Sequence, residues 1–378
     1  MYDLIIVGGN LAGASAALNA AKNGVNVLLI EKNKEPLFPP RCGEATDSIT
    51  SKILKLDEIK CPKNEISNIT FNVTSKNKFS FKAKKYRFII IDRNYLEKYL
   101  QKTAKEAGAE LLLGCKVVNF NPPHEIIIDN EKTFKGKVLI DASGIRCLLG
   151  KKIGLNPELK PADIGVCIQS RVQCNIDPNN LKMWFHNPYA PMGYAWFFPK
   201  NENLANIGLG VPGNLKLDLE AKLKTYIENE IKGDYKILHT FRSCVPSAKP
   251  LDRLVKDNVM FVGDAARLTN AIFENGINLA IFSGTLAGVV AARYIKGDIK
   301  NLHYYEKLIE NKKNRLIRIY NSKSKQTTED KFEKSFSRGF NLLNIANKIF
   351  PNLLQNQLIK IVKKDKKIID YLKYKYQI

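Results

Sequence analysis

Residues 3–13 read DLIIVGGNLAG, and residues 25–31 read VNVLLIE. The apolar runs in both stretches predict buried parallel strands, because such strands have no solvated face. The Ala-rich residues 12–23 between them have helical spacing. Strand, helix and strand within about thirty residues predict a β-α-β unit at the start of an α/β protein.

A glycine-rich turn joins the first predicted strand to the helix. In a G-x-G-x-x-G turn, the first glycine makes the bend, the second admits a pyrophosphate, and the third lets helix and strand pack closely. Gly8 and Gly13 match this pattern, whereas Asn10 stands at the middle position. Glu31 closes the second strand, where an acid accepts hydrogen bonds from a ribose hydroxyl. A dinucleotide site is predicted, and the alternative is an ordinary glycine-rich turn.

Another buried strand is predicted at residues 259–264, followed by small residues that begin a helix. It places Asp264 at its C-terminal end, which resembles the flavoprotein motif whose aspartate binds the ribityl chain of FAD. Gly276 and Ile277 would bring a helix N-terminus to the flavin ring. With Arg93 and the DASG segment, these motifs in order resemble the p-hydroxybenzoate hydroxylase superfamily over residues 1 to about 295.

The segment P-M-G-Y-A-W-F-F-P at residues 191–199 reads P-x-x-Y-x-W-x-F-P. It is similar to the signature of the geranylgeranyl reductase family, which implies that Tyr194, Trp196 and Phe198 line a substrate tunnel. From the residues alone, clustered aromatics on a strand form a wide apolar wall suited to a hydrocarbon. The alternative is an ordinary aromatic core strand.

The segment R-C-G-E-A at residues 41–45 resembles a C-G-E segment of the same family that folds against the flavin. The resemblance implies that Cys42 lies beside the isoalloxazine ring, where its location makes it a candidate proton donor. The alternative is a small buried hydrophobic residue. Together the resemblances imply cofactor contacts from Gly8, Ala12, Gly13, Glu31, Cys42, Gly43, Ala45, Arg93, Val117, Asp264, Gly276 and Ile277.

The chain departs from the family pattern before the last long helix. Relatives usually show P-x-x-G-G-G-I, whereas residues 271–277 here read A-I-F-E-N-G-I. Glu274 and Asn275 therefore replace two glycines, in addition to Asn10 in the first turn. We expect these positions to alter the approach of the backbone to FAD.

The predicted fold is α/β, with a Rossmann-type FAD-binding domain interleaved with an antiparallel-sheet substrate domain and a helical C-terminal region. Residues 277–292 are uncharged but too short for a membrane span, so we expect a buried helix. The expected ranges are 1–65, 92–160 and 249–300 for the FAD-binding domain, 66–91 and 161–248 for the substrate domain, and 301–378 for the helical region.

The net charge of +23 predicts attraction to polyanions. The alternative is a Lys-rich surface of the kind found in hyperthermophiles. Residues 358–377 combine lysines with apolar residues at helical spacing, as in a helix lying on an anionic membrane, although a helix packed on the protein body fits equally well. Starting without a signal peptide, and with seven scattered cysteines, the chain is expected in the cytoplasm, peripheral to the inner membrane face, with no metal site.

The resemblance implies FAD-dependent reduction of isolated C=C bonds in geranylgeranyl chains of archaeal membrane lipid precursors. The expected partners are an isoprenoid lipid, an anionic membrane surface and an electron donor, either ferredoxin or NAD(P)H. Two alternatives remain: a flavin monooxygenase on the same fold, and a basic nucleic-acid-binding protein that keeps a nucleotide fold. No helix-turn-helix, zinc finger or RNA-binding motif supports the second, so no nucleic acid is expected.

Overall fold

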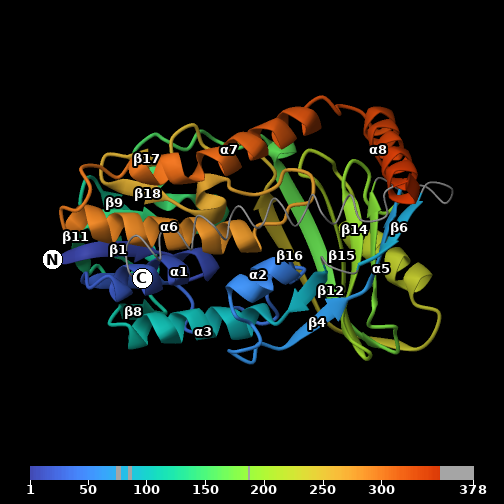
Figure 1. The fold of residues 1–378 in the computed structure, drawn as a ribbon, viewed down its shortest axis with the longest axis horizontal. Helices are drawn as coiled ribbons and strands as arrows, with labels where there is room; N and C mark the ends of the chain where they lie inside the picture. Colours follow the sequence, from blue (N-terminus) through green and yellow to red (C-terminus); the bar gives the residue numbers. More distant parts are fainter. Residues whose placement is uncertain (74–77, 84–86, 186–187, 350–378) are drawn as a thin grey trace.

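An eight-stranded sheet carries the predicted nucleotide-binding unit (Figure 1). In this computed structural model, which describes residues 1–73, 78–83, 87–185 and 188–349, the main strand order is β17-β18-β11-β1-β2-β8. Neighbours from β18 to β8 are parallel. The strands are β1 (Tyr2–Val7), β2 (Val27–Glu31), β8 (Glu110–Leu113), β9 (Val117–Asn121), β10 (Glu125–Ile128), β11 (Thr133–Asp141), β17 (Val255–Lys256) and β18 (Val259–Phe261).

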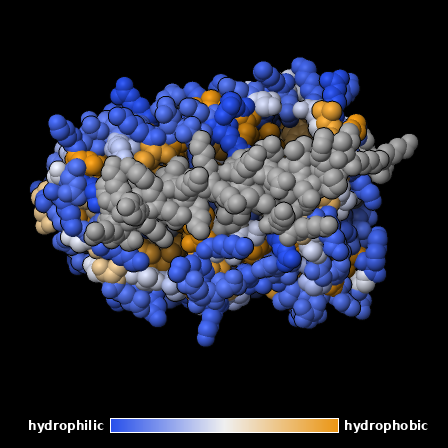
Figure 2. All heavy atoms as spheres, viewed as in Figure 1, coloured by the Kyte–Doolittle hydropathy of each residue, from blue (hydrophilic) through white to orange (hydrophobic). Residues whose placement is uncertain are grey.

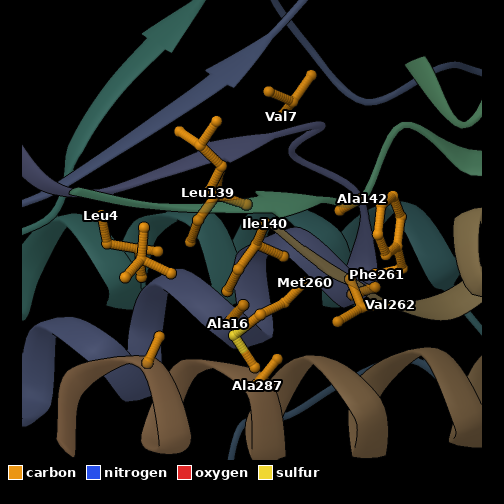
Figure 3. Packing of buried hydrophobic residues seen from close by; sticks show 14 of the residues in the cluster. Leu4, Val7, Ala16, Leu139, Ile140, Ala142, Met260, Phe261, Val262 and Ala287 are labelled. Atoms are coloured by element: carbon orange, nitrogen blue, oxygen red, sulfur yellow. The ribbon is translucent and has the colours of Figure 1, made fainter. Parts of the chain in front are cut away.

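Two helices, α1 (Leu11–Lys22) and α6 (Ile277–Ile295), pack together below the strands. Figure 3 shows Ala16 of α1 and Ala287 of α6 facing the buried strand side chains. The helices approach closely because α6 has glycine at the contact. A Cβ on Gly284 would lie 2.1 Å from the Ala12 carbonyl oxygen. The strands of this sheet, α1 and α6 therefore share one buried hydrophobic cluster.

Helix α6 is long and apolar enough to cross a membrane by length and composition. However, 72% of its apolar window is buried inside the protein, as expected for a core helix.

A seven-stranded sheet forms the other half of the molecule, in the order β16-β12-β15-β14-β13-β5-β6 (Figure 1). Successive side chains along each strand point to opposite faces of this sheet, as the two-residue period of a strand requires. Ala195 and Phe197 pack against helix α5 (Leu219–Glu230), whereas Trp196 and Phe198 face the opposite way. The strands are β5 (Asn68–Asn72), β6 (Lys78–Lys82), β12 (Ile164–Cys174), β13 (Asn180–Phe185), β14 (Tyr194–Asn201), β15 (Leu204–Pro212) and β16 (Tyr235–Pro246).

A small sheet and the remaining helices connect the two halves. The last two long helices reach the seven-stranded sheet (Figure 1), where Phe336 stacks on Phe185 with 4.7 Å between ring centroids. The small sheet contains β3 (Ala45–Asp47), β4 (Lys63–Ile66) and β7 (Phe88–Ile91). The helices are α2 (Ser48–Ile53), α3 (Arg93–Glu106), α4 (Leu148–Lys152), α5 (Leu219–Glu230), α7 (Tyr304–Lys323) and α8 (Glu329–Ile349), with short 3-10 helices η1 (Gly144–Arg146), η2 (Pro161–Asp163) and η3 (Gly263–Ala266).

The structure confirms the predicted α/β class, with two sheets interleaved along the chain and helices at the C-terminal end. Strands β5 and β6 join the seven-stranded sheet although about ninety residues separate them from its other strands, and β5 pairs in parallel with β13. By contrast, β7 pairs with β3 and β4 in the small sheet.

Candidate functional site

The turn between β1 and α1 requires glycine at both matching positions. Gly8 has φ +104°, and a Cβ there would lie 2.3 Å from the Ala142 carbonyl oxygen. A Cβ on Gly13 would lie 1.8 Å from the Gly8 carbonyl oxygen. Ala12, beside Gly13, is buried against α6. The turn thus has the close backbone packing that a phosphate-binding loop requires.

Asn10 has extended backbone and caps α1 with its side chain. Its Oδ1 accepts a hydrogen bond from the Ala12 amide at 2.9 Å, and its Nδ2 donates to the Ala142 carbonyl at 2.6 Å. Asn10, at the middle position of the motif, therefore occupies one of the backbone N–H groups that a helix N-terminus offers to a phosphate. Asn10 needs no left-handed backbone.

Glu31 ends β2 and lies against the glycine turn. One carboxylate oxygen accepts the Gly9 amide at 2.8 Å, and the other accepts the Asn33 amide at 2.9 Å. A carboxylate has about four acceptor positions, so capacity remains for a ribose hydroxyl. The Gln101 side chain, from α3, donates to the Gly9 carbonyl at 2.7 Å. Val117 is buried at the start of β9, two residues after Cys115, whose amide bonds the Glu31 carbonyl.

Asp264, Arg93 and Gly276 converge from three separate parts of the chain. Asp264 lies on η3 directly after β18, and burial raises the pKa of its carboxyl while Arg93 opposes the shift. A Cβ on Gly276 would lie 3.4 Å from an Asp264 carboxylate oxygen. Ile277 is the first, buried residue of α6.

These residues fit an FAD molecule. Among the described residues, the buried Nε of Arg93 has no hydrogen-bond partner, and its charge acts on the partly exposed Asp264 carboxylate. Buried polar groups normally have partners, so such an unpartnered group marks a place where a ligand completes the bonding. The glycine turn and the Glu31 carboxylate supply the other contacts that a dinucleotide needs.

The predicted aromatic strand lies directly against the flavin-side loops. Tyr194, Trp196 and Phe198 all point to the same face of β14, as their alternate spacing requires. The Tyr194 hydroxyl donates to the Phe273 carbonyl at 2.8 Å, in the loop before α6. The Trp196 indole donates at 2.8 Å to Gln169, whose amide donates at 3.2 Å to the Cys42 carbonyl.

Gly43 is enclosed by the same aromatic face. A Cβ there would lie 3.0 Å from the Phe198 ring, so the C-G-E loop rests on the aromatic strand β14. Ala45 follows at the start of β3, paired with Ile90. Cys42 is partly buried, and its sulfur accepts the Glu44 amide at 3.2 Å. The structure therefore brings the two family segments, separated by about 150 residues, into direct contact.

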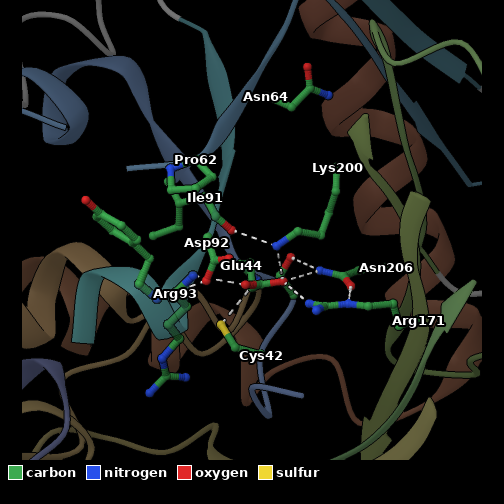
Figure 4. Close-up of polar contacts among 12 residues, drawn as sticks. Cys42, Glu44, Pro62, Asn64, Ile91, Asp92, Arg93, Arg171, Lys200 and Asn206 are labelled. Atoms are coloured by element: carbon green, nitrogen blue, oxygen red, sulfur yellow. Dashed lines mark hydrogen bonds and ion pairs between the residues drawn. The ribbon is translucent and has the colours of Figure 1, made fainter. Parts of the chain in front are cut away.

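Glu44 is the centre of a buried ionic network between the two halves (Figure 4). Its Oε2 accepts from Arg171, from Lys200 at 2.7 Å and from Asn206 at 2.8 Å. Its Oε1 accepts the Arg93 amide at 3.0 Å, at the start of α3. One side chain thereby joins strands β12, β14 and β15 of the seven-stranded sheet to the FAD side.

Several residues of this site were not among the predicted ones. Glu44 stands inside the quoted C-G-E segment, so its motif offered a signal. Glu274 was noted only as a departure from the family pattern. For the others no local pattern offered a signal, because their partners come from distant parts of the chain. They are Gln101, Gln169, Arg171, Lys200 and Asn206.

The glycine turn, the acidic strand ends and the Arg93–Asp264 pair define an FAD-dependent oxidoreductase. A family model for FAD-dependent oxidoreductases matches residues 3–150, and a model for the geranylgeranyl reductase catalytic domain matches residues 163–245. The chain belongs to the geranylgeranyl reductase family, which confirms the resemblance noted in the sequence.

Curated relatives and solved structures agree with this assignment. A digeranylgeranylglycerophospholipid reductase of Methanococcoides burtonii is 32% identical over 81% of this chain and 79% of its own. One from Methanocaldococcus jannaschii is 32% identical over 78% of each chain. The crystal structure of a geranylgeranyl bacteriochlorophyll reductase-like protein from Thermoplasma acidophilum has a TM-score of 0.78 at 28% identity, covering 88% of this chain and 90% of that one. A flavin-dependent brominase shares the fold alone, with a TM-score of 0.64 at 19% identity.

Proposed function

We propose that this protein saturates isolated C=C bonds in the geranylgeranyl chains of archaeal membrane lipid precursors, with digeranylgeranylglycerophospholipid as the substrate. The contact between the aromatic strand and the flavin-side loops carries the proposal: Trp196 is linked through Gln169 to Cys42. The names of the relatives support the same lipid. An aromatic face directly beside a flavin site suits a long hydrocarbon better than a polar substrate.

The positions of these residues suggest which part of FAD each would contact. Gly8, Ala12 and Gly13 would receive the pyrophosphate, and Glu31 the adenosine ribose. Asp264 and Arg93 would lie near the ribityl chain. Gly276 with Ile277, and Cys42, Gly43 and Ala45, would face the ring, while Val117 would lie at the adenosine end. Bound FAD, once reduced, supplies the hydride for the alkene.

The protein's own residues position the chain and keep water out. Trp196 and Phe198 are 5% and 7% exposed, and Tyr194 completes the same face. Their rings form a dry wall, so an alkene held against it is desolvated. The Tyr194 hydroxyl and the Trp196 indole N–H already donate hydrogen bonds to protein groups, and these bonds fix the orientation of both rings. The resulting surface selects for shape and apolarity.

A membrane lipid as substrate supports a peripheral position of the enzyme at the cytoplasmic membrane face, which is part of the proposal. The net charge of +23 supports attraction to anionic lipid, and the face in Figure 2 is hydrophilic over most of its outline. Residues 358–377, proposed as the surface helix, lie outside the described residues. Either ferredoxin or NAD(P)H remains the proposed electron donor.

The test is anaerobic turnover of digeranylgeranylglycerophospholipid with chemically reduced, FAD-loaded protein, followed by mass spectrometry of the lipid. Each saturated bond adds two hydrogens, and we expect a stepwise series of such products. Hydroxylated lipid formed in air with NAD(P)H would instead establish a monooxygenase. Absence of flavin absorbance after incubation with FAD would refute the cofactor assignment as well.

A further inference from the structure

Glu274 lies in the loop before α6. The proposed cofactor contacts assign no role to this acid. It stands two residues before Gly276, at a position where the family pattern has glycine. Its backbone has φ +51°, the left-handed region that an L residue adopts at a cost. The neighbouring Phe273 carbonyl is bonded to the Tyr194 hydroxyl at 2.8 Å. The aromatic strand thus fixes the loop segment that carries this glutamate.

The Glu274 carboxyl lies on the face of the seven-stranded sheet. A Cβ built on Gly165 would be 2.1 Å from one carboxyl oxygen, and one on Gly210 would be 3.4 Å from the other. The two glycines, in adjacent strands β12 and β15, therefore provide the space that the carboxyl fills. The Cys167 thiol donates to it at 3.6 Å. Gly210 pairs with both Cys167 and Tyr194, so the carboxyl lies on the same row of the sheet as the tunnel tyrosine.

The fold changes the pKa of Glu274 and of the titratable groups around it. Burial raises the pKa of Glu274 to about 7, with the Lys323 ammonium opposing the shift. Burial and then Glu274 raise the pKa of Cys167 and Tyr194 well above their usual values, and that of Cys244 as well. Burial lowers the pKa of Lys323, which donates to Ser247 Oγ at 2.7 Å.

A small pocket lies beside this carboxyl, next to the Tyr194 ring. Glu274 is partly exposed and lines the pocket together with Met192, Tyr194 and Phe332, the last from α8. An apolar chain lying against Tyr194 would therefore lie close to the Glu274 carboxyl. A general acid requires a position within hydrogen-bond reach of the reacting atom and a pKa near the operating pH.

We propose that Glu274 is the proton donor to the alkene, an inference that rests on the proposed reductase function. One alkene carbon gains the hydride from reduced flavin, and the O–H bond of the Glu274 carboxyl breaks as its proton forms a C–H bond with the other carbon. The two electrons come from the reduced flavin, so the alkene is reduced and the flavin oxidised. The carboxylate then recovers a proton from solvent, and Lys323 stabilises its charge in the interval.

The test compares wild-type protein with Glu274→Gln, Glu274→Asp and Glu274→Gly, all loaded with FAD. After anaerobic reduction, each is mixed with the lipid alkene and the return of flavin absorbance is followed. We expect the glutamine variant to be slower by about 10²- to 10⁴-fold, the range for loss of a general acid. The wild-type rate should fall as pH rises through about 7, and the aspartate variant should recover part of the rate and the pH dependence.

A second measurement does not depend on turnover. A carboxyl whose pKa is raised on folding contributes stability at low pH that is lost as pH rises from its ordinary value, 4.5, to about 7. The wild-type melting temperature should therefore fall relative to that of Glu274→Gln over this interval. Glu274→Gly should still fold, since glycine adopts the left-handed backbone without strain.

The outcomes separate this inference from the function on which it rests. If wild-type protein saturates no alkene, the proposed function fails first. If wild-type protein is active but Glu274→Gln keeps its rate and pH profile, only the proton-donor assignment is overturned. Loss of the pH profile in Cys42→Ala, with its retention in Glu274→Gln, would transfer the role to Cys42.

Discussion

Replacing Glu44 by glutamine should weaken the junction between the two halves of the protein. The Glu44 side chain is fully buried, and its Oε2 accepts bonds from Arg171, Lys200 and Asn206. Glutamine keeps the shape, but it has no charge and offers those donors at most one acceptor oxygen. Two buried or nearly buried cations would then lose their counter-charge.

The structure sets the size of this effect. Removing one partner of a buried ion pair costs about 3–5 kcal/mol, because the remaining charge is desolvated without compensation. The Lys200 side chain is 12% exposed and can turn toward water, whereas Arg171, at 8%, keeps its bond to Asn206 at 3.2 Å. Both features favour the lower end of the range, about 3 kcal/mol in the free energy of unfolding.

Urea denaturation with FAD in excess measures this loss, after correction for any change in FAD affinity. The matched control is Glu65→Gln, which also removes a partner of two cations, Lys63 at 2.6 Å and Arg87 at 3.0 Å. Its side chain is 39% exposed, so the change should cost at most about 1 kcal/mol. Equal, small losses in both variants would refute the view that burial makes the Glu44 network important.

Three further predictions concern the cofactor, the substrate and the membrane. Glu31→Ala should weaken FAD binding by about 10- to 100-fold in a fluorescence titration, since a ribose hydroxyl loses a charged acceptor; unchanged affinity would contradict the assignment. Trp196→Phe keeps an aromatic ring but leaves the Gln169 carbonyl without its 2.8 Å donor, so lipid turnover should fall about tenfold. Its flavin absorbance should not change, and full activity would argue against the tunnel. Deleting residues 358–378 should reduce salt-sensitive sedimentation with anionic vesicles, and undiminished binding would exclude that segment as the anchor.

Local patterns in the sequence were sufficient for the nucleotide-binding unit. The apolar runs of β1 and β2 are continuous because parallel strands are buried on both faces, and the glycine spacing follows from the tight turn between strand and helix. Gly13 is fixed by its contact with Gly8 in the same turn, and Gly8 by its φ of +104°. The aromatic strand could also be predicted from the sequence, since Tyr194, Trp196 and Phe198 alternate with residues of the other face.

Only the tertiary structure decided how these pieces act together. Strands β5 and β6 join a sheet whose other members follow about ninety residues later, and no local period encodes the pairing of β5 with β13. The same holds for Glu44, whose cationic partners come from β12 and β14. The sequence shows Glu274 only as the replacement of a family glycine. Its raised pKa arises from burial in the fold, where Gly165 and Gly210 leave space for the carboxyl. The sequence determined the cofactor and the aromatic wall through short-range pattern, whereas desolvation, which sets charge and reactivity, depends on which distant surfaces meet.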